Sequence, residues 1–122
     1  MPIESYQDLT VWQKAMEMVE RCYQLTRAFP SQEMYGMISQ IRRAAVSIPA
    51  NIAEGWGREG TQEFVQFLRI AQGSVKELET LLLLSLRVQL VKAPEINPIL
   101  EMLSEVSRML HSLIGSLRRK LK

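Results

Sequence analysis

The sequence offers few side chains of the kinds that carry out catalysis. His111 is the single histidine and Cys22 the single cysteine of the 122 residues. A Cys–His nucleophile pair would need these two to meet, and nothing in their spacing indicates that. No Glu-x-x-His pair occurs, which excludes the di-iron chemistry of other four-helix proteins. The glutamates are scattered over expected helix surfaces, where solvation explains them better than acid–base catalysis. We therefore expect no enzyme, no metal and no other cofactor.

A glycine pattern of the dinucleotide-binding type, GxGxxG, occurs from Gly55 to Gly60. That fingerprint works between a strand and a helix of a parallel sheet, and no convincing strand precedes it here. A helix C-cap followed by a short interhelix loop explains the glycines better. An alternative stays open, in which the helix N-terminus after Thr61 holds an anion such as phosphate with help from Arg58.

Basic residues form a second group with a potential role. Arg69, Lys76 and Arg87 recur at spacings of seven and eleven, along one line of an expected helix. Such a line can follow a phosphate backbone. Solvated surface charge is the simpler explanation, because Glu79 stands beside Lys76. With the loop arginine and the basic C-terminal run, the candidate nucleic-acid contacts are Arg58, Arg69, Lys76, Arg87, Arg118, Arg119 and Lys120.

A line of polar side chains crosses the otherwise apolar segment 37–55. Glutamine, serine and asparagine dominate it, and this composition favours an internal hydrogen-bond network over a face in water. Helical spacing lets Asn51 reach Ser47 or Glu54, and a carboxylate of another helix, such as Glu77, is a candidate partner for Arg43. Whether the line faces its own core or a sister subunit stays open. The predicted network contains Gln40, Arg43, Ser47, Asn51, Glu54 and Glu77.

Four amphipathic segments must position these residues. Apolar side chains recur at intervals of three and four, as one face of a helix requires. We predict a single all-α domain over residues 1–122 that assembles with copies of itself. The expected helices span about 9–28, 33–55, 62–90 and 98–119.

Several local features of these helices are also predicted. Thr61 and Asn97 have the side chains preferred at helix N-caps. Pro49 predicts a bend without a break, and Gly73 predicts close approach of a partner helix. Within segment 37–55, which we expect to be hidden from water on nearly every side, Arg42 is the residue suited to solvent.

The charge balance permits nucleic acid without requiring it. Fifteen lysines and arginines stand against 13 aspartates and glutamates, a net charge of +2, far from the dense positive field of a nucleic-acid coat. Neither a signal-type apolar segment nor a run of membrane-spanning length is found. These features indicate a cytoplasmic bacterial setting with no membrane partner.

Several sequence blocks carry a family resemblance over about residues 5–90. They are VWQKA (Val11 to Ala15), Phe29-Pro30 with Glu33, SQIRRAAVSIPANIAEG (Ser39 to Gly55) and GSVKELE (Gly73 to Glu79). In these blocks the chain resembles the bacterial four-helix-bundle family first described as proteins encoded in 23S ribosomal RNA intervening sequences. The resemblance implies an antiparallel up-and-down four-helix bundle in a ring-like homo-oligomer, with a pentamer as the suggested copy number.

A more distant resemblance in fold is to the accessory protein of diversity-generating retroelements, which is thought to work beside a reverse transcriptase on nucleic acid. Most members of the intervening-sequence family have no assigned biochemical activity. The leading hypothesis is a non-enzymatic oligomer that binds RNA, DNA or a nucleic-acid-handling protein. The alternative is a structural or protein-interaction module that binds no nucleic acid.

Overall fold

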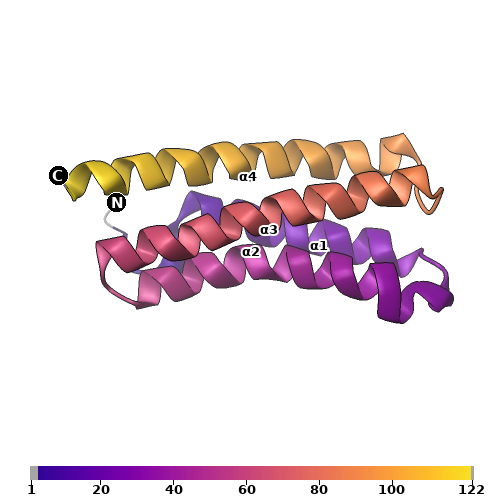
Figure 1. Cartoon of the computed structure of the whole chain (residues 1–122), viewed down its shortest axis with the longest axis horizontal. Helices are drawn as coiled ribbons and strands as arrows, with labels where there is room; N and C mark the ends of the chain where they lie inside the picture. The colour runs from indigo at the N-terminus through magenta and orange to yellow at the C-terminus, as the bar shows by residue number, and fades with distance from the viewer. Residues whose placement is uncertain (1–2, 122) are drawn as a thin grey trace.

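Four long α-helices make up most of the computed structural model, which describes residues 3–121. They are α1 (Thr10–Arg27), α2 (Ser39–Gly57), α3 (Thr61–Arg87) and α4 (Ala93–Lys120). The helices lie side by side along the long axis and are joined at their ends by short connections (Figure 1). No strand occurs among the described residues, so the predicted all-α class is confirmed. None of the described helices is long and apolar enough to cross a membrane.

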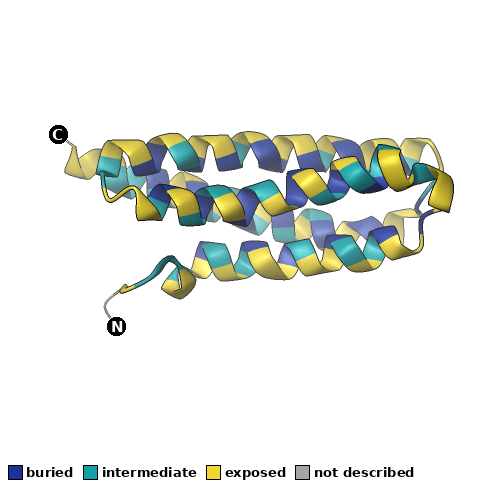
Figure 2. Ribbon diagram, turned by 90° about the horizontal axis from the view of Figure 1, so that it is seen from below, coloured by how far each residue is buried: buried dark blue, intermediate teal, exposed yellow. Residues whose placement is uncertain are grey.

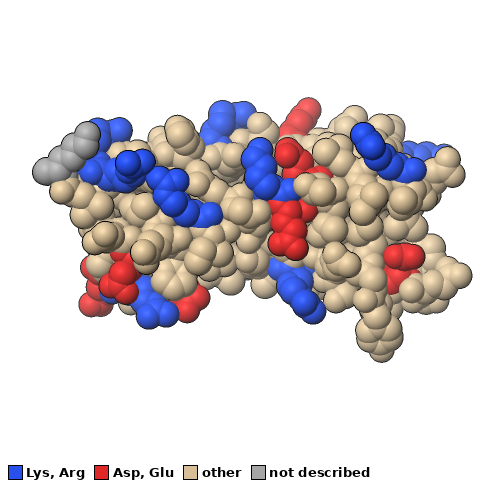
Figure 3. Space-filling view, viewed as in Figure 1, with Lys and Arg blue, Asp and Glu red and all other residues tan. Residues whose placement is uncertain are grey.

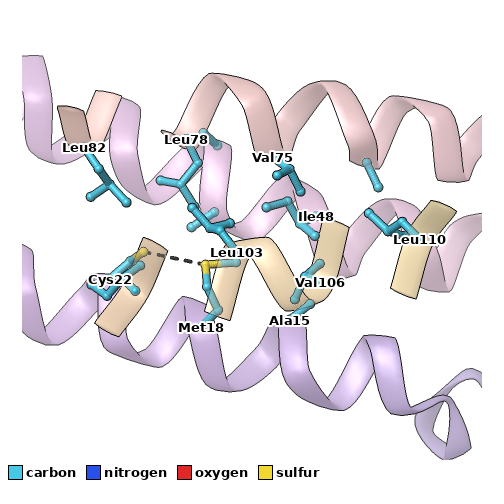
Figure 4. Close-up of a cluster of buried hydrophobic side chains, with 14 of the residues drawn as sticks. Ala15, Met18, Cys22, Ile48, Val75, Leu78, Leu82, Leu103, Val106 and Leu110 are labelled. Atoms are coloured by element: carbon cyan, nitrogen blue, oxygen red, sulfur yellow. Dashed lines mark hydrogen bonds between the residues drawn. The ribbon is translucent and has the colours of Figure 1, made fainter. Parts of the chain in front are cut away.

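Each helix turns one apolar face toward a shared core. α2 packs against α1 and α3, and α4 packs against the same two helices. The buried faces point inward and the exposed faces outward along every helix (Figure 2). Met18, Ile48, Leu78 and Leu103, one from each helix, are at most 1% exposed and meet in the middle of this core (Figure 4). The apolar periodicity therefore predicted the core faces correctly.

The segment before α2 departs from the predicted start of the helix at residue 33. A 3-10 turn at Ser31–Glu33 is followed by a π-helix at Met34–Ile38, in which Gly36 has a non-helical backbone (φ −112°, ψ −109°). The Glu33 carboxylate accepts a hydrogen bond from the Met37 amide at 3.3 Å. Regular α-helix begins only at Ser39 and continues through the buried Pro49.

The predicted N-caps at Thr61 and Asn97 are wrong. Gly60 caps α3, and Thr61 is the first helical residue. α4 begins five residues before the predicted start, because Pro94 lies in the first turn, where no amide donor is needed. The Glu95 carboxylate accepts a hydrogen bond from the Lys92 amide at 2.8 Å. α3, the helix before α4, ends at Arg87 and not at the predicted residue 90.

Arg42 and Arg43, which are neighbours on α2, each lie in the environment that the sequence predicted for the other. Arg42, expected in water, is half-buried and donates from Nε to Thr26 Oγ1 of α1 at 2.8 Å. Its guanidinium lies 4.4 Å from the centre of the Tyr23 ring. Arg43, expected in the polar network, is exposed. The reason is the position of α1, whose polar side chains cover the Arg42 side of α2.

Segment 37–55 is less hidden in the single chain than the sequence predicts. α1 and α3 cover its flanks, and between them one face of the helix stays open to water. Gly73, expected to admit a close helix, is also exposed, and an added Cβ there would meet no atom within 4 Å. The exposed residues on this face of α2 are Gln40, Arg43, Val46, Ala50 and Glu54.

Candidate functional site

A small polar cluster joins α2 to α3 at the edge of the core. The hydroxyl oxygens of Ser47 and Ser74 are 2.8 Å apart. Asn51 donates from Nδ2 to the backbone oxygen of Ser47 at 2.7 Å and to its hydroxyl at 3.0 Å. Ser74 is only 8% exposed. Because buried hydroxyls need partners, these contacts favour one register of α2 against α3.

Two of the six predicted network residues take part in this cluster. Sequence reasoning paired Asn51 with Ser47 and missed Ser74, although Ser74 follows Ala71 and precedes Leu78 at core spacing. The other four side chains turn to the surface. Glu54 pairs with Arg58 at 3.3 Å, whereas Gln40, Arg43 and Glu77 make no side-chain hydrogen bond or ion pair within residues 3–121. The proposed Arg43–Glu77 pair is therefore absent from the single chain.

The glycine-containing connection between α2 and α3 packs tightly. An added Cβ on Gly55 would lie 2.6 Å from Phe67 Cβ, so glycine permits this close approach. The Arg58 guanidinium lies 5.1 Å from the centre of the Phe67 ring. The Trp56 and Phe64 rings meet edge to face, with centroids 6.0 Å apart.

A hollow of about 340 Å³ opens beside this connection. Its lining includes the carboxylate-bearing Glu59, whereas Arg58 is engaged by Glu54 and does not line it. A carboxylate disfavours a bound anion. The arrangement therefore gives little support to the alternative of an anion site at Thr61. The lining residues are Gly55, Trp56, Glu59, Gly60, Thr61 and Phe64.

The predicted basic line on α3 is exposed but interrupted. Arg69, Lys76 and Arg87 all lie on the solvent side of the helix. Lys76 pairs with Glu79 at 3.7 Å, and exposed pairs of this kind contribute little stability. Lysines and arginines gather over the end of the molecule where α4 finishes, and acidic groups break the same face near its middle (Figure 3). Further acidic groups lie at that end below the basic ones.

Three further cations, Arg118, Arg119 and Lys120, occupy the last turn of α4. This turn lies at the same end as the connection between α2 and α3 (Figure 1). Arg58, the C-cap residue of α2, belongs to the same end. The structure thus brings these four candidate contacts to one end, while Arg69, Lys76 and Arg87 lie progressively farther along α3.

Cys22 and His111 do not share a site. Cys22 is fully buried, and its thiol donates to Met18 Sδ at 3.7 Å (Figure 4). Burial raises the pKa of the Cys22 thiol to about 12, which keeps it protonated and poorly nucleophilic. His111 lies exposed on α4. Across the described part of the chain, no three His, Cys, Asp or Glu side chains lie together in a way that could hold a metal ion.

The comparison with protein families decides what kind of protein this is. The family model described as 23S rRNA-intervening sequence protein matches residues 7–112. The chain belongs to that family. This confirms the resemblance predicted from the sequence blocks. The most extended block, Ser39 to Gly55, forms most of α2, the helix that supplies Ser47 and Asn51 to the polar cluster.

A solved structure is also similar to this chain. A protein of unknown function from the S23 ribosomal protein family of Bacteroides thetaiotaomicron is similar with a TM-score of 0.77 and 28% identity. The similarity covers 86% of this chain and 98% of that one. No curated protein matches this chain.

Proposed function

We propose that this chain forms a non-enzymatic homo-oligomer that binds nucleic acid, or a partner that handles nucleic acid, through one basic end. The observation that carries this proposal is the run of Arg118, Arg119 and Lys120 in the last turn of α4. None of the three forms an ion pair within residues 3–121. Arginine and lysine that are free of carboxylates can bind phosphates and release counterions. A cytoplasmic setting belongs to the same proposal.

The proposed assembly is a ring of antiparallel up-and-down four-helix bundles, with five as the expected number of copies. Short connections between neighbouring helices support the antiparallel order. The open face of α2 and the apolar side chains exposed on α3 support contacts between copies. A ring would repeat the basic end of every copy around one rim, which multiplies a charge that is weak in one chain.

A salt titration of binding tests the nucleic-acid proposal. Structured RNA and duplex DNA are each titrated with the wild-type protein between low and physiological ionic strength. We expect retention at low salt and a linear fall of log affinity with log salt concentration, by about 0.9 in slope for each phosphate contact in duplex DNA. Failure to retain either nucleic acid at low ionic strength would refute the proposal.

A charge-matched pair of variants locates the contact. The triple variant Arg118→Gln, Arg119→Gln, Lys120→Gln is expected to bind more weakly and to show a shallower salt slope. The control triple, Arg21→Gln, Arg27→Gln, Lys92→Gln, removes the same number of exposed cations from parts of the molecule outside the basic end and the open face of α2. Equal losses in the two triples would indicate a dependence on net charge alone and would contradict a basic end.

The second candidate function is a protein-interaction module without nucleic-acid binding. The observation that favours it is the group of apolar side chains exposed at the end of α3, formed by Leu83 and Leu84 of the helix and Val88 at its C-cap. Affinity capture followed by identification of the bound material separates the two functions. A defined protein partner with no associated nucleic acid would favour the module.

A further inference from the structure

Two apolar surfaces lie at the end of the molecule opposite the basic run of α4. One is Tyr35 with Met34, just before α2, and the other is formed by Leu83 and Leu84 of α3 with Val88 at its C-cap. The segment before α2 and the last turns of α3 lie at the same end in Figure 1. Single exposed apolar residues are common on proteins, whereas a group of neighbouring exposed apolar side chains indicates a contact surface.

Tyr35 is placed in solvent by the backbone before α2. The π-helix at Met34–Ile38, with the non-helical Gly36 next to Tyr35, carries this side chain away from the core. Tyr35 is 97% exposed and has no hydrogen bond or aromatic contact within the part of the chain that the structure describes. Tyrosine is enriched among the residues that dominate the centres of protein interfaces.

A hollow of about 280 Å³ on the outer side of α3 has suitable chemistry for such a side chain. Leu83 and Leu84 supply apolar walls, Thr80 a hydroxyl and Arg87 a guanidinium. An aromatic ring can pack on the leucines and lie within about 6 Å of a guanidinium. Arg87 has no carboxylate partner among residues 3–121, so its guanidinium is available for that contact.

The Tyr35 side chain does not fill the hollow of its own chain, since it is almost wholly exposed. In a ring whose symmetry axis runs along the helices, the surfaces that meet between neighbouring copies lie at the same height. Tyr35 and the hollow satisfy this condition because they occupy the same end of the molecule. Different surfaces on the two partners make a head-to-tail contact, which is the kind that closes into rings.

We infer that Tyr35 of one copy inserts into the Thr80–Leu83–Leu84–Arg87 hollow of the next copy. This inference rests on the proposed ring and specifies the contact that builds it. A buried aromatic side chain covers about 150–250 Å², less than the roughly 800 Å² that each partner of a stable interface usually buries. Met34 and Val88 extend the two surfaces, and the open face of α2 supplies further area. In this contact Arg87 serves assembly and does not bind nucleic acid. The proposed nucleic-acid surface lies at the opposite end of the molecule.

Light scattering on the full chain and its variants tests the inference. Tyr35→Ala removes the inserted ring and Leu84→Glu places a charge in the hollow, so each is expected to weaken assembly at least about tenfold. Tyr35→Phe keeps the ring and is expected to retain the wild-type mass. Met16→Ala, at an exposed apolar residue of α1 that belongs to none of these surfaces, is the matched control. Circular dichroism checks that every variant keeps its helical signal.

Mixing the two disruptive variants gives the sharpest result. The Leu84→Glu chain still carries Tyr35, and the Tyr35→Ala chain still carries an intact hollow. The mixture is therefore expected to form one-to-one dimers that grow no further. If the wild type is an oligomer and both variants keep its mass, the Tyr35 contact is wrong, but the proposed ring is not contradicted. A monomeric wild type would contradict both the contact and the ring.

An engineered disulfide provides an independent measurement. Tyr35→Cys combined with Thr80→Cys is expected to cross-link neighbouring copies on mild oxidation, giving a ladder of bands that ends at the copy number of the ring. The buried Cys22 does not compete for oxidation. A protein that stays a single unlinked band while wild-type oligomers are present would contradict the inference.

Discussion

At the scale of single residues, Gly55 packs tightly between the end of α2 and the first turns of α3. An added Cβ would lie 2.6 Å from Phe67 Cβ and 3.0 Å from Phe64 Cδ1. Overpacking a tight contact costs about 1–3 kcal/mol. We expect Gly55→Ala to lower the free energy of unfolding by this amount, measured by urea denaturation.

Gly73→Ala is the control for this prediction. Gly73 lies in the middle of α3 with no atom within 4 Å of an added Cβ. Alanine is the better helix former by about 1 kcal/mol, so this variant is expected to be equal to the wild type or slightly more stable. A similar loss of unfolding free energy in both variants would mean that crowding at Gly55 is not the cause of the loss.

Cys22 makes stability depend on pH in the alkaline range. Burial raises the pKa of its thiol from 9.0 to about 12. Below pH 9 the thiol is protonated in the folded and unfolded chains alike. Between pH 9 and 12 only the unfolded chain releases this proton. The free energy of unfolding is therefore expected to fall as pH rises, by about 1.4 kcal/mol per unit from this group.

Comparing the wild type with Cys22→Ala isolates the thiol from the lysines and tyrosines that titrate in the same range. The stability advantage of the wild type over Cys22→Ala is expected to be constant below about pH 8 and smaller at about pH 10.5. An advantage that is unchanged across this range would show that the thiol ionises as easily in the folded chain as in the unfolded one.

At the scale of helices, Arg42 fixes α2 against α1. It donates to Thr26 Oγ1, which in turn donates to the backbone oxygen of Cys22 at 2.8 Å, and it lies over the Tyr23 ring. Losing a hydrogen bond to a charged group and a cation–π contact costs about 1.5–3 kcal/mol. Thermal unfolding of Arg42→Ala is expected to show a loss of that size. Arg43→Ala, its exposed neighbour, is expected to stay within about 0.5 kcal/mol of the wild type.

Ser47 and Ser74 are expected to be energetically coupled across α2 and α3. Ser47→Ala leaves the buried Ser74 hydroxyl without its interhelical partner, so the single variant is expected to lose about 1 kcal/mol. The double variant is expected to lose less than the sum of the single losses by at least about 0.5 kcal/mol. Additive losses in a double-mutant cycle would show that the hydroxyl contact does not hold the register.

Arg42 and Arg43 also show what the periodicity of one helix cannot predict, which is the environment that its neighbour provides. Periodicity placed the apolar seam of α2 correctly, because Ile41, Ile48 and Ile52 recur at core spacing. The same periodicity placed Arg43 in the polar line and Arg42 in water. It carries no information about which side chains the neighbouring helix presents, and Tyr23 and Thr26 of α1 decide the environment of Arg42. The beginning of α4 was missed for a related reason, since both Pro94 and Pro98 fit the first turns of a helix.

At the scale of the whole molecule, the sequence predicted the class of fold and the family more fully than the candidate site. Four amphipathic helices can all bury their apolar faces by packing around one shared core. The site depends on details that composition does not determine. The backbone around Gly36 sets the exposure of Tyr35, and the connections set which cations share an end.

The central claim is that copies of this chain assemble. Its most direct test is the mass of the wild-type protein in solution, measured by light scattering at micromolar concentration and moderate salt. The predicted result is a single species several times the 14.0 kDa of one chain, with five copies as the expected number. A species of 14.0 kDa across the whole concentration range would contradict the account.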